Sequence, residues 1–403
     1  MIRKIHVFIV LIFSSAFSQD LVEFSLGPGY EYDVFFSLNE GLSGYADRGN
    51  WDLAFTTDQD PENANIRINS GNNVTLFKVI DPSISWEAVL SQSDAVMQLR
   101  NSNFDWSIGA FVSDAVAGDN CGWGIYNPSE QTVIGNSIYI INYAGQTKKI
   151  RINSLINGEF NITLADLNGS NEHTVSIPTS NSTDKKFIYY SIVNDQIIDR
   201  EPASEDWDIV FTRYEEDLYL DTPDEPFFYK VQGALTNNNN VSQFDGNIFA
   251  DFFIENLLFS TNISTIGYDW KEYGSGFMIV PNRSYYIYTQ DNQSLFRIIF
   301  QSYDGMSTGN MSFTYEQVLN VTSMDDLSNS TIKIYPNPNN GNFFIEYNGN
   351  DSRLNIMDFT GKIVFSNEIN SSQTINMNNF SKGVYFLNLF NDQSNIVKQF
   401  LVK

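Results

Sequence analysis

A duplicated segment sets the tightest limit on how this chain can fold. The phrase "NWDLAF" occupies Asn50–Phe55 and "DWDIVF" occupies Asp206–Phe211, which places Trp51 and Trp207 156 positions apart. Ordered matches at one spacing indicate a repeated structural unit. We therefore predict two similar units, over residues 19–180 and 181–319. Four further pairs of segments keep the same order at nearly the same spacing: Asp33–Leu38 with Phe187–Ile192, Gly122–Asn127 with Tyr268–Gly274, the stretches that begin at Ser137 and Ser284, and those that begin at Gly158 and Gly309.

Each predicted unit has the residue pattern of β-strands. "SIYIINY" and "TKKIRIN" flank a turn signal at 144–146, and "SYYIYTQ" and "LFRIIF" flank another at 291–292. Runs of β-branched and aromatic residues on both sides of a turn predict hairpins. We expect one short helix within 83–100, the best match to a helical pattern. The predicted fold class is all-β, with two tandem similar β domains and a small C-terminal β-sandwich.

The Trp-Asp phrases predict how each unit fills its interior. In a strand that starts at Trp51, the side chains of Trp51, Leu53 and Phe55 share one face, and the same alternation applies after Trp207. A buried tryptophan removes a large apolar area from water, while the neighbouring carboxylate can accept N–H groups of a turn. The alternative is a tryptophan that stacks on a ligand.

The first 18 residues have the three parts of a signal peptide. Arg3 and Lys4 give a basic start, an apolar run covers Val7–Phe13, and Ala16–Ser18 carries the small-residue cleavage pattern. A buried first strand is the alternative. The run is too short to span a bilayer, and we expect no transmembrane segment in the mature chain.

Charge and cysteine content narrow the function classes. The chain has 48 acidic and 23 basic residues, for a formal net charge of −25. This charge repels phosphate backbones, so we expect no nucleic-acid partner. With Cys121 as its single cysteine, the chain cannot form an internal disulfide and must rely on core burial.

The second unit resembles a known family. "DWDIVFTRY" and "SYYIYTQDNQSLFRIIFQSYDGMSTGNMSFTYEQV" are similar to the start and end signatures of HmuY-like domains, which are all-β haem-binding proteins secreted or displayed by Bacteroidetes. The resemblance covers Phe187–Val318 best and Asp33–Leu167 more weakly, through the repeat. It implies a β fold with a cleft for haem or a similar flat hydrophobic ligand.

The chain departs from this family at the iron ligands. Well-known members hold haem iron between two histidines, whereas His173 is the only histidine after the predicted signal peptide. Some relatives use methionine pairs, and thioether ligation of haem iron is chemically reasonable. Met278 and Met306 are therefore the candidate haem ligands. The alternative is that these methionines fill a core.

Other site chemistry has weaker sequence support. Acidic loops at 58–62 and 221–225 could offer oxygen ligands to calcium, but neither has EF-hand spacing, and solvated loops are the default in so acidic a chain. We predict no metal site. Signatures of hydrolases, zinc proteases and phosphate-binding loops are absent from the sequence. We expect a protein without enzymatic activity, with no catalytic residues, although carboxylate pairs alone leave glycosidase chemistry open.

The C-terminal segment resembles the type A sorting domain of the type IX secretion system. "TIKIYPNPNNGNFFIEY", "LNIMDFTGKIVF" and "GVYFLNLF" carry the resemblance, which covers 331–403 and implies the secretion machinery as a partner. An ordinary β module is the alternative. Residues 320–330 are the predicted linker. The predicted sorting-signal residues are Pro336, Asn337, Pro338, Gly341, Gly361, Lys362, Gly383, Tyr385 and Lys398.

Two functions follow from these patterns. The first is a secreted or cell-surface binding protein without enzymatic activity, exported by the type IX system and binding haem or a similar flat ligand as its one cofactor. The second is a structural or adhesive surface protein that binds glycan or no small ligand.

Overall fold

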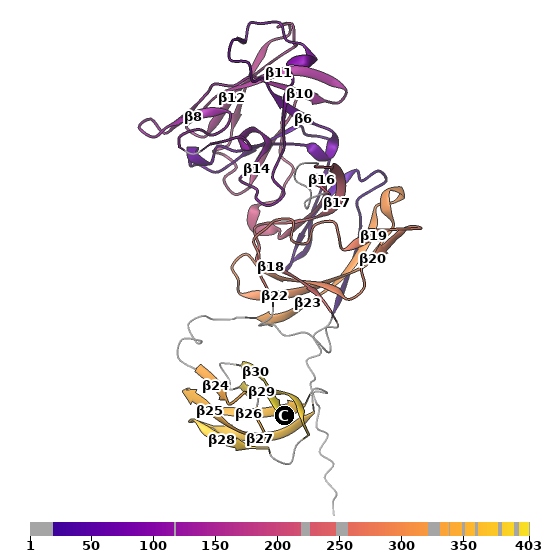
Figure 1. Cartoon of the computed structure of the whole chain (residues 1–403), viewed down its shortest axis with the longest axis vertical. Coiled ribbons are helices and arrows are strands. Elements are labelled where there is room, and N and C mark those ends of the chain that lie inside the picture. Colours follow the sequence, from indigo (N-terminus) through magenta and orange to yellow (C-terminus); the bar gives the residue numbers. More distant parts are fainter. Residues whose placement is uncertain are drawn as a thin grey trace, which may run out of the picture. The chain divides into compact units, whose positions relative to one another are not determined.

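A computed structural model describes residues 19–402 except 117, 219–225, 247–256, 321–330, 338, 349–350, 359–361, 378–380 and 391–394. The predicted signal peptide and residues 321–330 of the predicted linker lie outside the described residues. The chain divides into two compact units, 1–320 and 321–403, and each is described by itself (Figure 1).

The described residues form strands joined by turns and single 3-10 turns, which confirms the all-β prediction. The expected helix within 83–100 is wrong, since this segment holds only a 3-10 turn and one short strand, β7 (Met97–Leu99). The 3-10 turns are η1 (Pro61–Asn63), η2 (Ser70–Asn72), η3 (Gln92–Asp94), η4 (Ala110–Val112), η5 (Ser204–Asp206) and η7 (Gly305–Ser307).

The first unit has two lobes (Figure 1). Lobe A contains β4 to β15 and has two sheets. One has the order β13-β12-β11-β10-β6-β7, with β8 and β9 attached through β11, and the other has the order β15-β14-β4-β5. Its other strands are β4 (Leu53–Thr56), β5 (Ile66–Ile68), β6 (Thr75–Lys78), β8 (Gly124–Asn127), β9 (Thr132–Gly135), β10 (Tyr139–Tyr143), β11 (Gln146–Ile156), β12 (Glu159–Ala165), β13 (His173–Pro178), β14 (Phe187–Ser191) and β15 (Gln196–Ile198).

Lobe B contains β1 to β3 together with β16 to β23. Its sheets have the orders β1-β23-β22-β21-β18, β17-β16-β2-β3 and β19-β20. Its strands are β1 (Asp20–Ser25), β2 (Tyr32–Ser37), β3 (Gly41–Asp47), β16 (Ile209–Asp217), β17 (Phe228–Thr236), β18 (Val241–Asp245), β19 (Lys271–Tyr273), β20 (Phe277–Ile279), β21 (Arg283–Tyr288), β22 (Ser294–Tyr303) and β23 (Asn310–Asn320).

The hairpins predicted from the repeat are present. β10 pairs with β11 from Tyr143 opposite Gln146, and β21 pairs with β22 from Tyr288 opposite Leu295. The first turn has two residues at positive φ, Ala144 and Gly145, the backbone that a two-residue hairpin loop requires.

The two sequence repeats exchange their first hairpins. In the repeat alignment β2 corresponds to β14, and β4 corresponds to β16. In the structure β2 pairs with β16 of the second repeat, with Phe36 opposite Ile209, while β14 pairs with β4 of the first repeat, with Tyr190 opposite Leu53. Lobe A is thus inserted between β3 and β16 of lobe B. The boundary at residue 180 stays a prediction of the sequence.

The aspartate of each Trp-Asp phrase fastens the exchanged strand. Asp208 Oδ2 accepts the backbone N–H of Leu38 at 2.8 Å, just past the end of β2. Asp52 Oδ2 accepts the N–H of Ile192 at 2.7 Å, just past the end of β14. Both aspartates are buried. The predicted turn-capping role is confirmed, and the N–H groups that they cap belong to the other repeat.

The tryptophans lie on the opposite face from the one predicted. A bend at Asp52 precedes β4, so strand alternation does not extend back to Trp51. The Trp51 ring packs against Tyr189, with centroids 5.0 Å apart and planes at 78°, instead of joining the main core of lobe A. Trp207 packs the same way against Phe35, at 5.4 Å and 75°. Both indoles therefore lie at the junction of the lobes.

The second unit is a small β-sandwich with its own core, which includes Phe343, Ile356 and Phe400. Its two sheets have the orders β24-β25-β28 and β27-β26-β29-β30. The strands are β24 (Thr331–Tyr335), β25 (Asn342–Asn348), β26 (Ser352–Asp358), β27 (Ile363–Ile369), β28 (Gln373–Asn376), β29 (Gly383–Phe390) and β30 (Asn395–Val402).

The predicted sorting-signal residues are spread over this sandwich. Asn337 Oδ1 accepts the N–H of Leu401 at 2.9 Å, and the Tyr385 hydroxyl donates to the Ser381 carbonyl at 2.7 Å. Gly341 leads into β25 at φ +90, a conformation that favours glycine. Of the others, the described ones lie on the surface or at a strand start: Pro336, Lys362, Lys398 and Gly383. Pro338 and Gly361 lie outside the described residues.

We predict that removing either clamping carboxylate destabilises the first unit. Asp52→Ala and Asp208→Ala each leave a backbone N–H without its acceptor in a buried site, which costs about 1–3 kcal/mol. Urea unfolding of the chain from Gln19 onward measures this loss. Asp206→Ala, which removes an exposed carboxylate beside Trp207, is the matched control and should stay within about 0.5 kcal/mol of wild type. Equal effects of all three substitutions would contradict the clamp.

Candidate ligand-binding pocket

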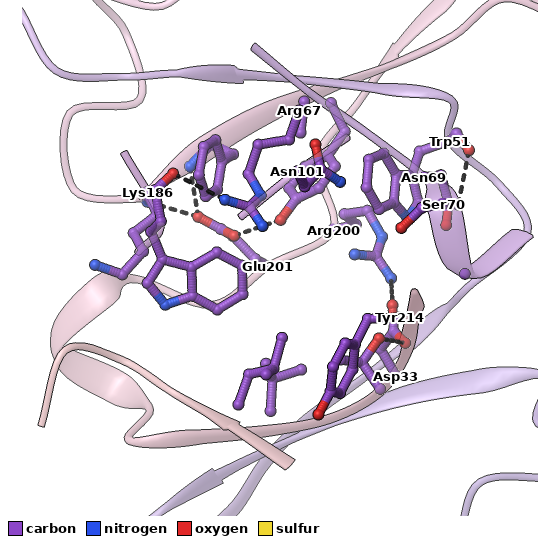
Figure 2. A pocket seen from close by; sticks show the side chains of 18 of the residues that line it. Asp33, Trp51, Arg67, Asn69, Ser70, Asn101, Lys186, Arg200, Glu201 and Tyr214 are labelled. Atoms are coloured by element: carbon purple, nitrogen blue, oxygen red, sulfur yellow. Dashed lines mark hydrogen bonds and ion pairs between the residues drawn. The ribbon is translucent and has the colours of Figure 1, made fainter. Parts of the chain in front are cut away.

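A cavity of about 80 Å³ opens where the two lobes meet (Figure 2). Residues from both sequence repeats line it, and they lie on the exchanged strands, on the strands beside them, on segments that precede or follow these strands, and on the loop at 101–106. The described lining residues are Asp33, Phe35, Trp51, Ala54, Arg67, Ile68, Asn69, Ser70, Gly71, Asn101, Asn103, Trp106, Lys186, Phe187, Tyr189, Arg200, Glu201, Trp207, Val210, Thr212, Arg213, Tyr214 and Leu235.

Two rows of cross-strand neighbours form opposite sides of the cavity. Side chains in register on adjacent strands project from the same face of a sheet. In lobe A the row crosses β14, β4 and β5, and in lobe B it crosses β2, β16 and β17. The residues in register are Tyr189, Ala54 and Arg67 in the first row and Phe35, Val210 and Leu235 in the second.

Aromatic rings cover much of the lining. The Trp106 ring lies 6.3 Å from Trp207, almost perpendicular at 86°, and 6.0 Å from Phe187. Its indole N–H donates to the Thr236 carbonyl of lobe B at 2.8 Å. Trp106 comes from lobe A, so this bond and the ring contacts join the two lobes beside the cavity.

Arg67 holds the loop that carries Trp106. Its guanidinium donates to the carbonyls of Ser102 at 2.7 Å, Asp105 at 3.0 Å and Trp106 at 3.1 Å. Burial lowers the pKa of Arg67 to about 10, because the charged form loses its hydration. The carbonyl oxygens partly replace that hydration, and the arginine is a structural cation of the site.

A buried ion pair connects the two sequence repeats at the cavity. Arg200 Nη2 lies 2.6 Å from Asp33 Oδ2, and the two side chains are only 4% and 5% exposed. Thr212 donates its hydroxyl to the other carboxylate oxygen at 2.7 Å. The Arg200 guanidinium also lies over the Tyr189 ring, 4.9 Å from its centroid. Figure 2 shows the pair at one side of the pocket.

Glu201 is a second buried carboxylate of the site. Its Oε1 accepts the N–H groups of Lys186 at 2.6 Å and Phe187 at 2.8 Å, and its Oε2 accepts the Tyr189 hydroxyl at 2.6 Å. Burial raises the pKa of Glu201, while these hydrogen bonds partly oppose the rise. Both carboxylates among the described lining residues therefore already accept several bonds from the protein.

Three N–H donors of the lining lack an acceptor among the described residues, and the Tyr214 hydroxyl, which can also accept, has no partner either. The three donors are the indole N–H of Trp51, the indole N–H of Trp207 and the Nε–H of Arg200. All three atoms are buried, and Trp207 is 2% exposed as a whole. Most buried polar groups in proteins are paired, so a cluster of unpaired donors at one cavity is unusual.

The methionines proposed as haem ligands lie elsewhere. Met278 is on β20 and 55% exposed, and Met306 is in η7 and 63% exposed. Neither lines the cavity at the lobe junction. Their assignment as ligands stays a prediction.

The acidic loop at 58–62 is organised by its own turn. Asp58 accepts the N–H of Asp60 at 2.9 Å and the side-chain amide of Asn63 at 2.8 Å, and Asp60 accepts the N–H of Glu62 at 3.0 Å. The loop at 221–225 lies outside the described residues. Within the described ranges, no group of three or more His, Cys, Asp or Glu side chains is placed to hold a metal ion.

The pocket residues that carry charge were not predicted from the sequence. Arg67 stands between two isoleucines in a short strand, and Arg200 and Glu201 follow the apolar pair Ile197 and Ile198. A charged residue inside an apolar segment is a signal for a paired or functional group. It could have directed attention to Arg67, but it does not reveal that the two segments meet.

Comparison with known proteins identifies the C-terminal unit. Residues 333–403 match the family described as "Secretion system C-terminal sorting domain", which confirms the predicted type IX sorting domain. The chain is thus exported by the type IX secretion system to the cell surface or the extracellular space, and the machinery of that system is its partner. No helix among the described residues is long and apolar enough to cross a membrane.

The curated proteins contain no match to this chain. A structure titled "Biofilm associated protein - BSP domain" has 9% identity and a TM-score of 0.16 over 89% of this chain, which spans 62% of that one. The structure titled "Sidekick-1 immunoglobulin domains 1-5" has 10% identity and a TM-score of 0.14. The match covers 88% of this chain and 77% of the chain in that structure. The resemblance of 19–319 to HmuY-like domains stays a prediction.

We predict that Glu201→Gln changes how stability depends on pH. Because burial raises the folded pKa above the unfolded value of about 4.3, the wild type loses stability as pH rises from there through the folded pKa. Each unit of difference corresponds to about 1.4 kcal/mol. The glutamine keeps one acceptor oxygen for Lys186 and Phe187 and does not titrate.

Urea unfolding between pH 4 and pH 7 measures this effect. The variant should gain stability relative to wild type as pH increases, whereas Glu205→Gln, at an exposed neighbouring carboxylate, should follow the wild type. A difference between Glu201→Gln and wild type that does not change with pH would refute the raised pKa.

Proposed function

We propose that this protein is a non-enzymatic binding protein of the cell surface or the extracellular medium, which holds a small ligand at the junction of its two lobes. The sorting domain directs the protein to the cell surface or the extracellular medium. The observation that carries the proposal is the cavity itself, where aromatic walls surround buried polar groups that include three unpaired donors. Concave sites with apolar walls and a few placed polar groups are typical of ligand binding.

The state of the cavity carboxylates favours binding over catalysis. A general base needs a lone pair that can reach a substrate proton. Asp33 accepts from Arg200 and Thr212, and Glu201 accepts from two backbone N–H groups and a tyrosine hydroxyl. Both carboxylates are committed to joining the elements around the cavity, so they suit a rigid binding site.

Haem binding is the second candidate, and it rests on the sequence resemblance. The cavity of about 80 Å³ is well below the roughly 300–1,000 Å³ of pockets that enclose drug-sized ligands. Met278 and Met306 are exposed side chains of lobe B, so they would have to bind iron at its surface, where Phe277 packs on Tyr303 at 4.8 Å. An adhesive surface protein that binds glycan is the third candidate, and the lobe junction could serve it as well.

Haem titration tests the second candidate. With the chain from Gln19 to Lys403, we expect the Soret band of haem to stay that of the free compound, because neither methionine is enclosed. A shifted band that Met278→Ala or Met306→Ala abolishes would instead establish haem as the ligand. A shifted band that both variants keep would establish haem binding and exclude these ligands.

Ligand binding at the lobe junction can be followed by tryptophan fluorescence. Three of the six tryptophans line the cavity, so an occupant should change their emission and raise the melting temperature by mass action. The test compounds are monosaccharides and small organic acids. Failure of every compound to change either signal would favour the structural or adhesive alternative.

A further inference from the structure

We propose that the cavity at the lobe junction recognises a carboxylate group, carried by an acidic sugar or by another small organic acid. This inference rests on the proposed binding function and specifies the ligand chemistry. It follows from the hydrogen-bond donors and the charges of the lining residues that their contacts within the protein leave unsatisfied.

Four lining groups lack a partner among the described residues: three are N–H donors, and the fourth is the Tyr214 hydroxyl, which can donate as well as accept. Trp51 and Trp207 each present an indole N–H, and Arg200 presents its Nε–H, with no acceptor within reach among the described residues. An indole N–H and a guanidinium N–H can only donate. The occupant must therefore supply acceptor atoms, and a carboxylate supplies two oxygens that can accept several bonds at once.

The charge of the lining also favours an anion. Arg67, Lys186, Arg200 and Arg213 line the cavity, against only two carboxylates, Asp33 and Glu201. The cavity is thus locally positive, although the whole chain has a net charge of −25. Burial lowers the pKa of Lys186, which means that its charged form is poorly compensated. An anion nearby would stabilise that charged form.

The unpaired donors come from both lobes, so one group can connect them. Trp51 and Trp207 occupy equivalent positions in the two repeats, and each packs edge-on against the aromatic residue of an exchanged strand. Arg200 lies over the Trp51 ring, 5.6 Å from its centroid. A carboxylate between the indoles would accept from both lobes and from the guanidinium.

The size of the cavity limits how much of the ligand it encloses. One water needs about 10–15 Å³ of such space, and a cavity of about 150 Å³ encloses benzene. The 80 Å³ here therefore suits a carboxylate and a few attached atoms, with the remainder of a larger ligand outside. An acidic sugar at the end of a glycan and a free organic acid both meet this condition.

The test is NMR of the indole N–H signals in the chain from Gln19 to Lys403, titrated with acetate, glucuronate and glucose. Trp51→Phe and Trp207→Phe assign the two pocket signals and remove one donor each while keeping an aromatic ring. Acetate and glucuronate should shift both signals, and glucose should not. Each substitution should weaken carboxylate binding by about tenfold, the effect of one hydrogen bond to a charged group.

Trp86→Phe is the matched control. Its indole N–H donates to Glu172 at 2.8 Å, and it does not line the cavity, so carboxylate affinity should stay at the wild-type value. Tighter binding of glucuronate than of acetate identifies an acidic sugar, and the reverse order identifies a small free acid.

Three results would overturn the inference, and they can be distinguished from one another. If glucose shifts both pocket signals as strongly as glucuronate, the ligand is a neutral sugar, and the binding function stands without the carboxylate. If none of the three compounds shifts either signal while the fluorescence test finds another ligand, the carboxylate is refuted alone. If neither the NMR titration nor the fluorescence test detects a ligand, the proposed binding function is refuted as well.

Discussion

The reciprocal pairing of β2 with β16 and of β14 with β4 is the contact on which the first unit depends. Each lobe takes an essential part of its core from the other sequence repeat, as Phe36 does in lobe B and Tyr190 in lobe A. The buried aspartates fasten the ends of the exchanged strands. Because each lobe is completed by the other repeat, the lobes must lie close together, and their junction becomes a permanent feature of the protein.

Divergence between the two repeats gives this junction its chemistry. The pairing register makes Arg67 and Leu235 equivalent, since each lies opposite the third residue after the tryptophan of its repeat. In the same way the repeat alignment makes Asp33 equivalent to Phe187. At both pairs of equivalent positions, one repeat therefore has a charged residue where the other has an apolar one. Two identical repeats with apolar residues at these positions would have formed a symmetric apolar junction. The differences between the repeats instead produce a small pocket lined by cations.

Much of the fold could be predicted from the sequence, but little of the pocket. Strand pattern, hairpin turns and the sorting domain are local properties, and they were confirmed. The alternation of a strand is the same whichever strand it pairs with, so the exchange of β2 and β14 has no local signal. The bend at Asp52 reversed the predicted face of Trp51 for a similar reason. Arg200 and Asp33 are 167 positions apart, and only the exchange brings them together.

The same topology explains how an exported chain without disulfides can hold its ends in place. β1 pairs with β23 from Asp20 opposite Tyr315, so the first and last strands of the unit are neighbours in one sheet. Contacts over nearly 300 positions form late, because the entropy of closing the loop must be met before the sheet can stabilise it. Lobe B therefore stays incomplete until its last strand is present. Once this sheet has formed, neither β1 nor β23 can separate without breaking the hydrogen bonds between them. Burial and strand pairing therefore provide the stabilisation that disulfides provide in many secreted proteins.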